Sequence, residues 1–278
     1  MNSTRSSFFN PGQIVLASVL ALVTFIALVP IIWTFLTSIK NPSDAFTIPP
    51  TVVFSPTFRY HWQIWVEGEF PRYLFNSTIV CIGTVCISVP IGSLAAYGLS
   101  RLPKRTATPI LFALFSLRMF PYMLLAIPFF VTARWTGLID TYWVLILAFV
   151  AINQPFTIWL MYGFFDEIPR ELDEAAALDG CNAWQTFYRV MLPLVRPGLA
   201  VTSIFSVILA YNEFLFALIL TGNRARTLPV AIASFGGEDV SEWSLAAAGA
   251  VGIMIPIIVV MILMQRNLLR GMTMGAVK

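Results

Sequence analysis

Two ionisable side chains, Arg118 and Glu213, stand inside long apolar segments and are the first candidates for a chemical role. A charged group at the centre of a membrane helix costs about 2.5–3.5 kcal/mol on insertion scales, so each one requires an explanation. In a structural role, the two side chains would pair with each other or reach the membrane interface, and would only lock helices together. In a functional role, they would line a polar path. Along a path, hydroxyls and amides would exchange hydrogen bonds with a solute, and the candidate set is Arg118, Tyr122, Asn153, Gln154, Asn212 and Glu213.

Histidine and cysteine, which serve most often in catalysis and in transition-metal sites, are scarce in this chain. His61 is the single histidine, Cys81 and Cys86 share one apolar segment, and Cys181 is remote from both, so neither a histidine-dependent triad nor a metal-ligand spacing is present. The sequence also lacks the G-x-x-x-x-G-K-[ST] loop that holds nucleotide phosphates. We therefore predict a non-catalytic chain with no metal and no cofactor of its own, in which no nucleophile and base for an intramembrane enzyme can be assembled.

Residues 166–198 form the longest polar interruption near the middle of the chain and predict a helix, a sharp turn and a second helix. Pro169 suits a first helical turn, and acidic residues crowd toward the positive end of the helix dipole. Gly180 supplies a left-handed stop, Asn182 can cap the second helix in a capping box, and Pro193 closes that helix. This segment is too polar to enter lipid and too short to be a domain.

The first of these two helices carries a surface that suits a partner protein. Ala175, Ala176 and Ala177 let the backbone of a partner approach closely, and Glu174 can pair with a cation in that partner. An ordinary amphipathic loop that covers the membrane surface is the alternative. Such helices usually carry Lys and Arg toward anionic headgroups, whereas this one is acidic. The residues alone leave both interpretations open.

The elements that position these residues follow from the composition. The chain has 278 residues, of which 58% are hydrophobic and only 11% charged, which is too apolar for a soluble globular domain. Apolar runs long enough to cross about 30 Å of hydrocarbon predict an all-α polytopic membrane protein with six spans in one transmembrane domain. The first run exceeds the apolar core of a signal peptide, so we expect it to be retained. The spans are predicted at about residues 14–36, 73–99, 108–132, 142–165, 199–220 and 244–264.

Basic residues indicate which side of the membrane each loop faces. Six spans put both termini on one side, and with the termini inside, the inner segments carry more Lys and Arg than the outer ones. The tight turn at residues 100–105 is rich in basic residues and agrees with this orientation. We therefore expect both termini and residues 166–198 to be cytoplasmic. The net charge of +3 is too small to suggest binding to nucleic acid.

The residue spacing in segment 166–198 resembles the EAA loop of ABC importer membrane subunits. Glu174-Ala175-Ala176, three residues, Gly180, nine residues and then Val190-x-Leu192-Pro193 follow the family pattern, with valine where isoleucine is more usual. Further strings, in their order and spacing, are similar to the shorter membrane subunit of carbohydrate ABC importers, the MalG type of maltose transporters, over most of the chain. These strings are TSIK (37–40), AAYGLSR (95–101), YNEFLFAL (211–218), TLPVAI (227–232) and the tail RGMTMGAVK (270–278).

This resemblance implies a pore-forming permease subunit that moves a mono-, di- or oligosaccharide from a solute-binding protein across the bacterial cytoplasmic (inner) membrane by alternating access. It implies a second, related permease subunit, an outward-facing loop at 221–243 that touches the extracytoplasmic sugar-binding protein, and a C-terminal tail that reaches the ATPase. It also implies docking into a cytoplasmic ATP-binding subunit dimer, which binds ATP and Mg, through Glu174, Ala175, Ala176, Gly180, Leu192 and Pro193.

Two alternatives to sugar import remain open from the sequence. The EAA loop is shared across importers, so the solute can be an amino acid, a peptide or an ion rather than a sugar. A secondary transporter driven by an ion gradient is the other, although such proteins favour internal repeats and intramembrane acids. Here no internal repeat is strong enough to use, and Glu213 is the single acid inside a predicted span.

Overall fold

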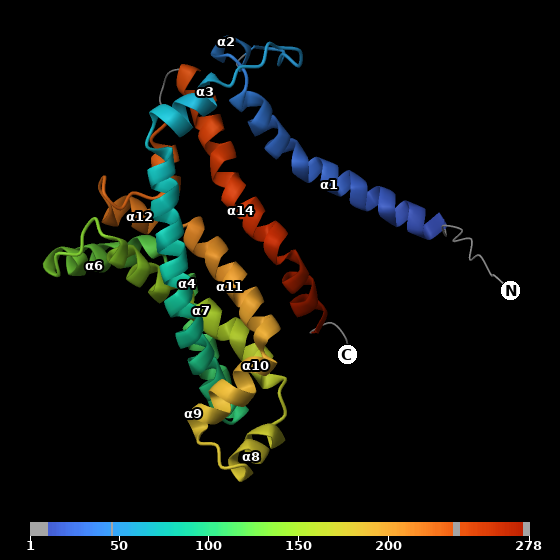
Figure 1. Cartoon of the computed structure of the whole chain (residues 1–278), viewed down its shortest axis with the longest axis vertical. Coiled ribbons are helices and arrows are strands. Elements are labelled where there is room, and N and C mark those ends of the chain that lie inside the picture. The colour runs from blue at the N-terminus through green and yellow to red at the C-terminus, as the bar shows by residue number, and fades with distance from the viewer. Residues whose placement is uncertain (1–10, 46, 236–239, 275–278) are drawn as a thin grey trace. The chain divides into compact units, whose positions relative to one another are not determined.

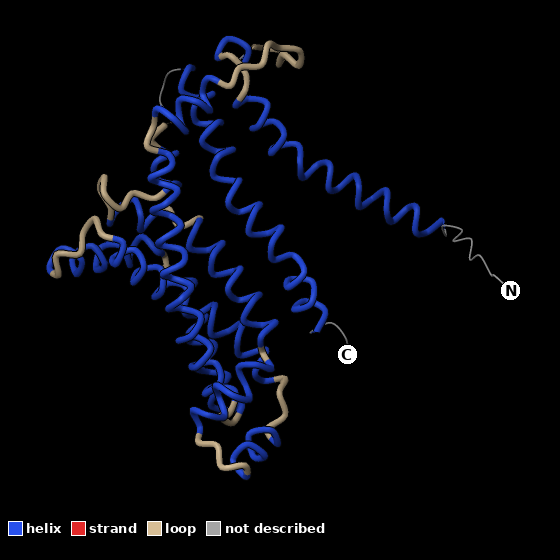
Figure 2. Tube along the Cα trace, viewed as in Figure 1, coloured by secondary structure: helices blue, strands red, loops and turns tan. Residues whose placement is uncertain are grey.

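The computed structural model describes residues 11–45, 47–235 and 240–274, and within them it contains helices and loops but no β-strand (Figure 2). The all-α class expected from the composition is confirmed. The chain divides into two compact units, the first made of residues 1–67 and 235–252 and the second of residues 68–234 and 253–278. The long helix α14 (Val240–Met274) contributes to both units.

The first unit starts with the apolar helix α1 (Pro11–Ser38), whose hydrophobic side chains are exposed along most of its length. Lys40, just after this helix, is buried, and its Nζ donates a hydrogen bond to the Thr51 carbonyl oxygen at 2.7 Å. The same Nζ lies 4.9 Å from the centre of the Trp33 ring, a cation–π contact that compensates for lost hydration. The unit continues through α2 (Pro42–Ala45), α3 (Arg59–Trp62) and the π-helical η1 (Gln63–Glu67).

Three long helices of the second unit, α4 (Phe70–Ser100), α7 (Tyr142–Asp166) and α11 (Arg196–Tyr211), pack against one another (Figure 1). Small and hydroxylated side chains let α4 and α7 approach closely. Ser88 Oγ lies 3.3 Å from Thr157 Oγ1, and Gln154 Nε2 donates to the Ser88 carbonyl oxygen at 3.2 Å. Side chains with less than 2% exposure, such as Phe149 and Met161 of α7, fill the core.

The third predicted span, residues 108–132, is not one straight helix in the structure. Helix α5 (Lys104–Ser116) continues into the 3₁₀ turn η2 (Leu117–Met119), and α6 (Tyr122–Trp135) follows at an angle of 86°. The break falls at Phe120-Pro121 because proline has no N–H to donate and forces the preceding residue out of the helical region; Phe120 has ψ 136°. Pro128, by contrast, stays inside α6.

The fifth predicted span, residues 199–220, is also interrupted. Helix α11 ends at Tyr211 and α12 (Leu215–Leu220) begins four residues later in the sequence. Asn212 Nδ2 donates to the Ile208 carbonyl oxygen at 2.8 Å, which competes with the backbone ladder. Glu213 Oε1 accepts a hydrogen bond from the Phe216 N–H at 3.2 Å and so supports the start of α12. The polar residues of this segment therefore lie where the helix is broken.

Four helices in the described part of the chain are long and apolar enough to cross a membrane, and the count rises to six if each of two bent pairs is one span. The second bent pair joins the helical segment 183–194 to α11 at 81°. The polar segment predicted at 221–243 contains the short helix α13 (Leu228–Ala233), while residues 236–239 lie outside the described residues. The end of the predicted C-terminal tail, residues 275–278, also lies outside them.

Candidate functional site

Loop 166–198 folds as two short helical segments joined at a glycine. The first is α8 (Glu171–Leu178), and the second runs through α9 (Ala183–Gln185), the π-helical η3 (Thr186–Met191) and α10 (Leu192–Leu194). Gly180 has φ 81°, a left-handed conformation that favours glycine. Asn182 and Gln185 form a reciprocal capping box, with both hydrogen bonds at 2.9 Å. The left-handed stop and the capping box predicted from the sequence are therefore confirmed.

The predicted end of the second helix at Pro193 agrees with the structure to within one residue. The helical segment continues through it to Leu194, and the chain bends only before Arg196. A π-helical turn lies directly before Pro193, and such a widened turn is one of the distortions that take up the missing N–H and the bulk of the ring. Leu192 and Pro193 are both half-buried.

The predicted partner-docking residues differ in their exposure. Glu174 and Ala175 on α8 are exposed, as is Gly180, but Ala176 is only 5% exposed and faces the rest of the chain. Most of α8 is exposed to solvent, and Leu178 near its end is 90% exposed. Glu174 and Ala175 therefore belong to the accessible surface of the loop, whereas Ala176 serves packing.

An ion pair attaches this loop to the end of α4. Asp173 Oδ2 lies 2.7 Å from Arg101 Nε, and the Tyr97 hydroxyl donates to the other carboxylate oxygen. Arg101 Nη1 in turn donates to the Phe165 carbonyl oxygen at 3.2 Å, at the end of α7. Arg170 adds a second attachment, because its Nη2 donates to the Leu102 carbonyl oxygen at 3.0 Å. We call the set Tyr97, Arg101 and Asp173 the clamp.

An apolar cluster lies beside the clamp and joins the same elements. Phe187 and Met191 of the loop are buried against Ala96 of α4 and against Met161 and Phe165 of α7. Fully burying a Phe or Met side chain contributes about 1.5–3 kcal/mol, so these two residues hold the loop more firmly than a surface contact would. Loop 166–198 and the ends of α4 and α7 are therefore expected to move as one body.

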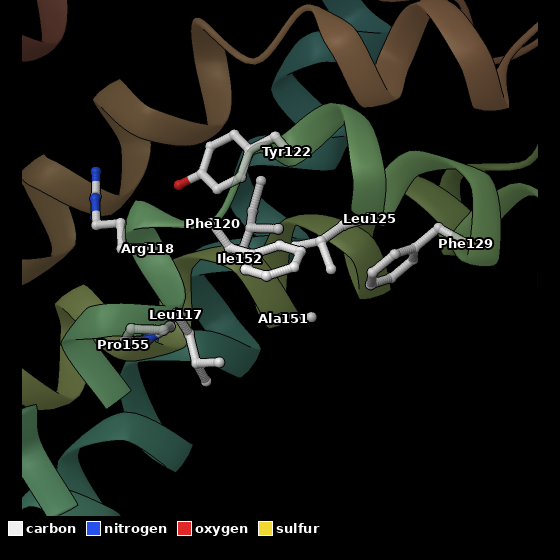
Figure 3. Close-up of a pocket in the computed structure, with 9 residues that line it drawn as sticks. All are labelled: Leu117, Arg118, Phe120, Tyr122, Leu125, Phe129, Ala151, Ile152 and Pro155. Carbon is white, nitrogen blue, oxygen red and sulfur yellow. The ribbon is translucent and has the colours of Figure 1, made fainter. Parts of the chain in front are cut away.

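A cavity of about 280 Å³ lies at the break between η2 and α6 (Figure 3). Arg118 and Tyr122, two of the residues predicted for a polar path, line it, and the Tyr122 hydroxyl points toward the side where the Arg118 guanidinium lies. The guanidinium also lies 4.8 Å from the centre of the Phe156 ring. The rest of the lining is mainly apolar and consists of Leu117, Phe120, Leu125, Phe129, Ala151, Ile152 and Pro155.

Arg118 and Glu213 do not pair with each other in the described structure. Arg118 Nη1 is buried without a hydrogen-bond partner among the described residues, and Glu213 caps α12 instead. The centroid of the Phe216 ring of α12 lies 6.3 Å from that of the Tyr122 ring. Helix α12, whose first turn Glu213 supports, therefore contacts a residue of the cavity. Broken membrane helices are tolerated where they line a cavity or are buried in protein, which fits this position.

The other predicted path residues are not brought to this cavity. Gln154 faces α4 through its bond to Ser88, and Asn153 is 3% exposed within α7, with its Nδ2 unpartnered among the described residues. Asn212 is occupied by the Ile208 carbonyl oxygen in the break after α11. The six residues therefore form no single constellation.

Residues 221–227, at the start of the second polar loop, are held by Asp140 and by α4. Asp140 Oδ1 accepts hydrogen bonds from the N–H groups of Gly222 and Ala225, both at 2.9 Å. Asn76 Nδ2 donates to the Arg226 carbonyl oxygen at 2.8 Å, and Arg72 Nη2 donates to that of Asn223 at 3.1 Å. These contacts fix the backbone of the loop while the Arg224 side chain remains exposed.

Asp140→Asn is expected to loosen this loop and to remove a pH dependence. Burial raises the pKa of Asp140, but hydrogen bonds from the backbone N–H groups of residues 222–225 outweigh it and hold the pKa below its ordinary value of 3.8. The carboxylate therefore stabilises the fold fully above about pH 4, and this contribution is lost as the pH falls through the lowered pKa. We expect Asp140→Asn to cost about 1–2 kcal/mol at neutral pH, since the site is partly exposed.

Thermal unfolding of wild type and Asp140→Asn in detergent, measured from neutral pH to below pH 4, checks this expectation. The difference in stability between the two proteins should shrink as the wild-type carboxylate is protonated. A difference that stays constant across this range would show that Asp140 acts without its charge.

Sequence reasoning missed the clamp and Asp140. Arg101 counted as a basic residue for orientation and as the end of the string AAYGLSR, and Asp173 as one acid near a helix dipole. Arg101 and Asp173 are 72 residues apart in the sequence, so no local spacing reveals the pair. The one local signal for Asp140 is its residue type, because aspartate tolerates a left-handed backbone better than most residues. In the structure Asp140 has φ 59°.

Residues 88–274 match the model of the family described as binding-protein-dependent transport system inner membrane component. The chain belongs to this family. Family membership and the apolar helices make it a multi-pass inner-membrane transport permease, in agreement with the family and fold predicted from the sequence. Such permeases are non-catalytic transport components.

Individual relatives of this permease extend the comparison to nearly the whole chain. The trehalose transport system permease protein SugB of Mycobacterium tuberculosis is 39% identical, over 92% of this chain and 94% of its own. The trehalose/maltose transport system permease protein MalG of Thermococcus litoralis is 34% identical, with the same two shares.

Two solved structures resemble the fold of this permease. A chain of a bacterial ABC transporter involved in the import of the acidic polysaccharide alginate matches with a TM-score of 0.71 and 25% identity, covering 96% of this chain and 98% of that one. A chain of a bacterial alginate ABC transporter in complex with its alginate pentasaccharide-bound periplasmic protein matches with a TM-score of 0.64, over 90% and 92%. At 16% identity, this second likeness shows the fold alone.

Proposed function

We propose that this permease is the pore-forming subunit of an ATP-driven importer that moves a sugar from a solute-binding protein across the cytoplasmic membrane. The observation that carries the proposal is the similarity, over more than nine tenths of the chain, to permeases named for trehalose and maltose transport. The likeness to a chain from an alginate importer extends the class to a polysaccharide. ATP and Mg are bound by partner subunits, and the basic inner segments support cytoplasmic termini.

Loop 166–198 is proposed to receive the movement of a cytoplasmic ATP-binding subunit dimer. Its exposed acid Glu174 and the accessible Ala175 offer a carboxylate beside a bare helix surface, which a basic residue and a close backbone can meet. The clamp and the apolar cluster then carry a displacement of the loop into α4 and α7. Closure of the ATPases would thus open the spans outward, and ATP hydrolysis would reset them to face inward.

The remaining partners are assigned by position. Residues 221–227 are proposed to meet the extracytoplasmic binding protein, because a loop with a fixed backbone and an exposed Arg224 loses little entropy on docking. The exposed apolar side chains of α1 suit lipid or a second, related permease subunit. No partner role for nucleic acid is proposed.

The cavity at the η2–α6 break is proposed to belong to the substrate path. Aromatic rings offer faces to the apolar side of a sugar, and Arg118 and Tyr122 offer hydrogen bonds to its hydroxyls. Asn153, Gln154, Asn212 and Glu213 remain candidates for other stages of the path and are not assigned to this cavity.

Arg118→Ala is expected to reduce sugar uptake by about 10- to 100-fold, because the loss of one charge-assisted hydrogen bond is worth about 1.5–3 kcal/mol. Glu213→Ala should lower uptake less, since its carboxylate supports α12 rather than the cavity. Uptake is measured in proteoliposomes with equal amounts of assembled complex. Unchanged uptake in both variants would return the two residues to a purely structural role.

The function itself is tested with the purified complex, its ATPase subunits and its binding protein in liposomes. We expect ATP hydrolysis to be stimulated by the binding protein loaded with one particular sugar, and that sugar to accumulate inside. Stimulation by an amino acid, peptide or ion instead would keep the importer and change the solute. Uptake that persists without ATP and collapses with the ion gradient would replace the proposal by a secondary transporter.

A further inference from the structure

A pocket with a volume of about 360 Å³ lies where loop 166–198 passes into the apolar helix α11. The helical segment 183–194, which ends in α10, meets α11 there at 81° (Figure 1). Two arginines, one phenol and three apolar residues surround this pocket: Tyr188, Arg189, Leu192, Pro193, Arg196 and Leu199.

Arg189 and Arg196 are not used by the fold of the described chain. Both are exposed, and neither forms an ion pair or a hydrogen bond with another described residue. Other basic residues of the region are engaged: Arg101 in the clamp and Arg170 at the Leu102 carbonyl oxygen. The pocket thus presents two unneutralised guanidinium groups beside an apolar wall.

We propose that this pocket binds the phosphate headgroup of an anionic phospholipid in the cytoplasmic leaflet. Guanidinium groups bind phosphate oxygens through paired hydrogen bonds, and basic pockets on the cytoplasmic side of membrane helices hold such headgroups. Tyrosine, represented here by Tyr188, is enriched at the level of the lipid headgroups. Leu192 and Leu199 would contact the start of the acyl chains. The cytoplasmic placement rests on the proposed function, which puts loop 166–198 on that side.

A lipid fits this pocket better than a soluble anion or an acidic protein side chain. A free phosphate would satisfy the arginines but leave Leu192 and Leu199 in contact with water. Arg196 is the first residue of α11, so the pocket lies at the level where that span leaves the hydrocarbon. The loop surface proposed to meet the ATPase is on α8 and carries Glu174, whereas Leu192 and Pro193, which the family resemblance also assigns to docking, line this pocket.

The test uses the assembled complex in nanodiscs of phosphatidylcholine mixed with phosphatidylglycerol, with retained lipid measured by native mass spectrometry. Arg189→Gln with Arg196→Gln should weaken phosphatidylglycerol retention about 25-fold, at about fivefold for each basic side chain near the surface. Arg105→Gln, an exposed arginine on the same predicted side but outside the pocket, should retain the lipid as wild type does. Arg189→Lys with Arg196→Lys, which keeps the charge and tests for misfolding, should fall between the two.

Four outcomes would overturn the proposal. The first is wild-type retention of phosphatidylglycerol in the double Gln variant, and the second is equal retention of the two lipids by wild type. The third is displacement of the lipid by inorganic phosphate. The fourth is loss of the ATPase subunit from the double Gln variant with lipid retention unchanged. The last would make the pocket a protein contact. Because the assay contains neither sugar nor ATP, a failure of the transport proposal would not alter its result.

Discussion

Arg101→Ala is expected to leave a complex that still hydrolyses ATP but imports little solute. The substitution removes the ion pair at 2.7 Å to Asp173 and the hydrogen bond to the Phe165 carbonyl oxygen, so the clamp keeps only the hydrogen bond from Tyr97 to Asp173. Breaking a buried pair costs about 3–5 kcal/mol, and we expect about 2–3 kcal/mol here because both side chains are about one fifth exposed. A loss of only 1.4 kcal/mol in the coupling free energy would lower the solute imported per ATP hydrolysed about tenfold.

The measurement is solute imported per ATP hydrolysed, in proteoliposomes that contain equal amounts of complex. Arg105→Ala, four residues further along the chain and exposed, is the matched control and should behave as wild type. Asp173→Ala should resemble Arg101→Ala, and the double variant should be no worse than either single one, because the two residues act as a pair. Full additivity of the two losses would mean that the clamp is not a coupled unit.

Gly92→Ala is expected to destabilise the packing of α4 against α7 by about 1–3 kcal/mol, the usual cost of forcing an extra methyl group into a packed interface. A Cβ at this position would lie 2.5 Å from Thr157 Cγ2, a distance so short that the Thr157 side chain or one of the two helices must shift. Since these two helices carry loop 166–198, transport should fall together with thermal stability.

Thr157→Ser provides a rescue, because it removes the clashing methyl group and keeps the hydroxyl that lies 3.3 Å from Ser88 Oγ. The combination Gly92→Ala with Thr157→Ser should recover most of the stability measured by thermal unfolding in detergent. Gly163→Ala on α7, where an added Cβ meets nothing within 4 Å, should be neutral or slightly stabilising. Equal damage from both glycine substitutions would contradict the close approach of α4 and α7.

The features that sequence predicted well are those decided by neighbouring residues. Gly180 ends α8 in a left-handed conformation, and Asn182 and Gln185 cap the next helix, because each device acts over a few residues of chain. Four of the six long apolar runs likewise correspond to helices that are long and apolar enough to cross a membrane. The EAA spacing and the accompanying strings predicted the family, which the comparisons confirm.

The features that sequence did not predict depend on tertiary context. Both Pro121 and Pro128 lie in one predicted span, yet the chain bends only at the first, where Phe120 is extended. The clamp joins α4 to α8 across a long stretch of sequence, and periodicity fixes no helix rotation that would bring Arg101 to Asp173.

Loop 166–198 is proposed to transmit the movement of a partner ATPase to this permease, and the Glu174→Lys variant separates this role from a structural one. The complex is reconstituted with its binding protein, and solute import and ATP hydrolysis are measured together. Glu171→Lys, an exposed acid on the same helix, makes the same charge change and serves as the control. We predict that Glu174→Lys inserts normally but uncouples import from hydrolysis, while Glu171→Lys keeps both. Import at the wild-type rate with normal ATPase stimulation in Glu174→Lys would show that Glu174 does not couple the ATPase to the permease.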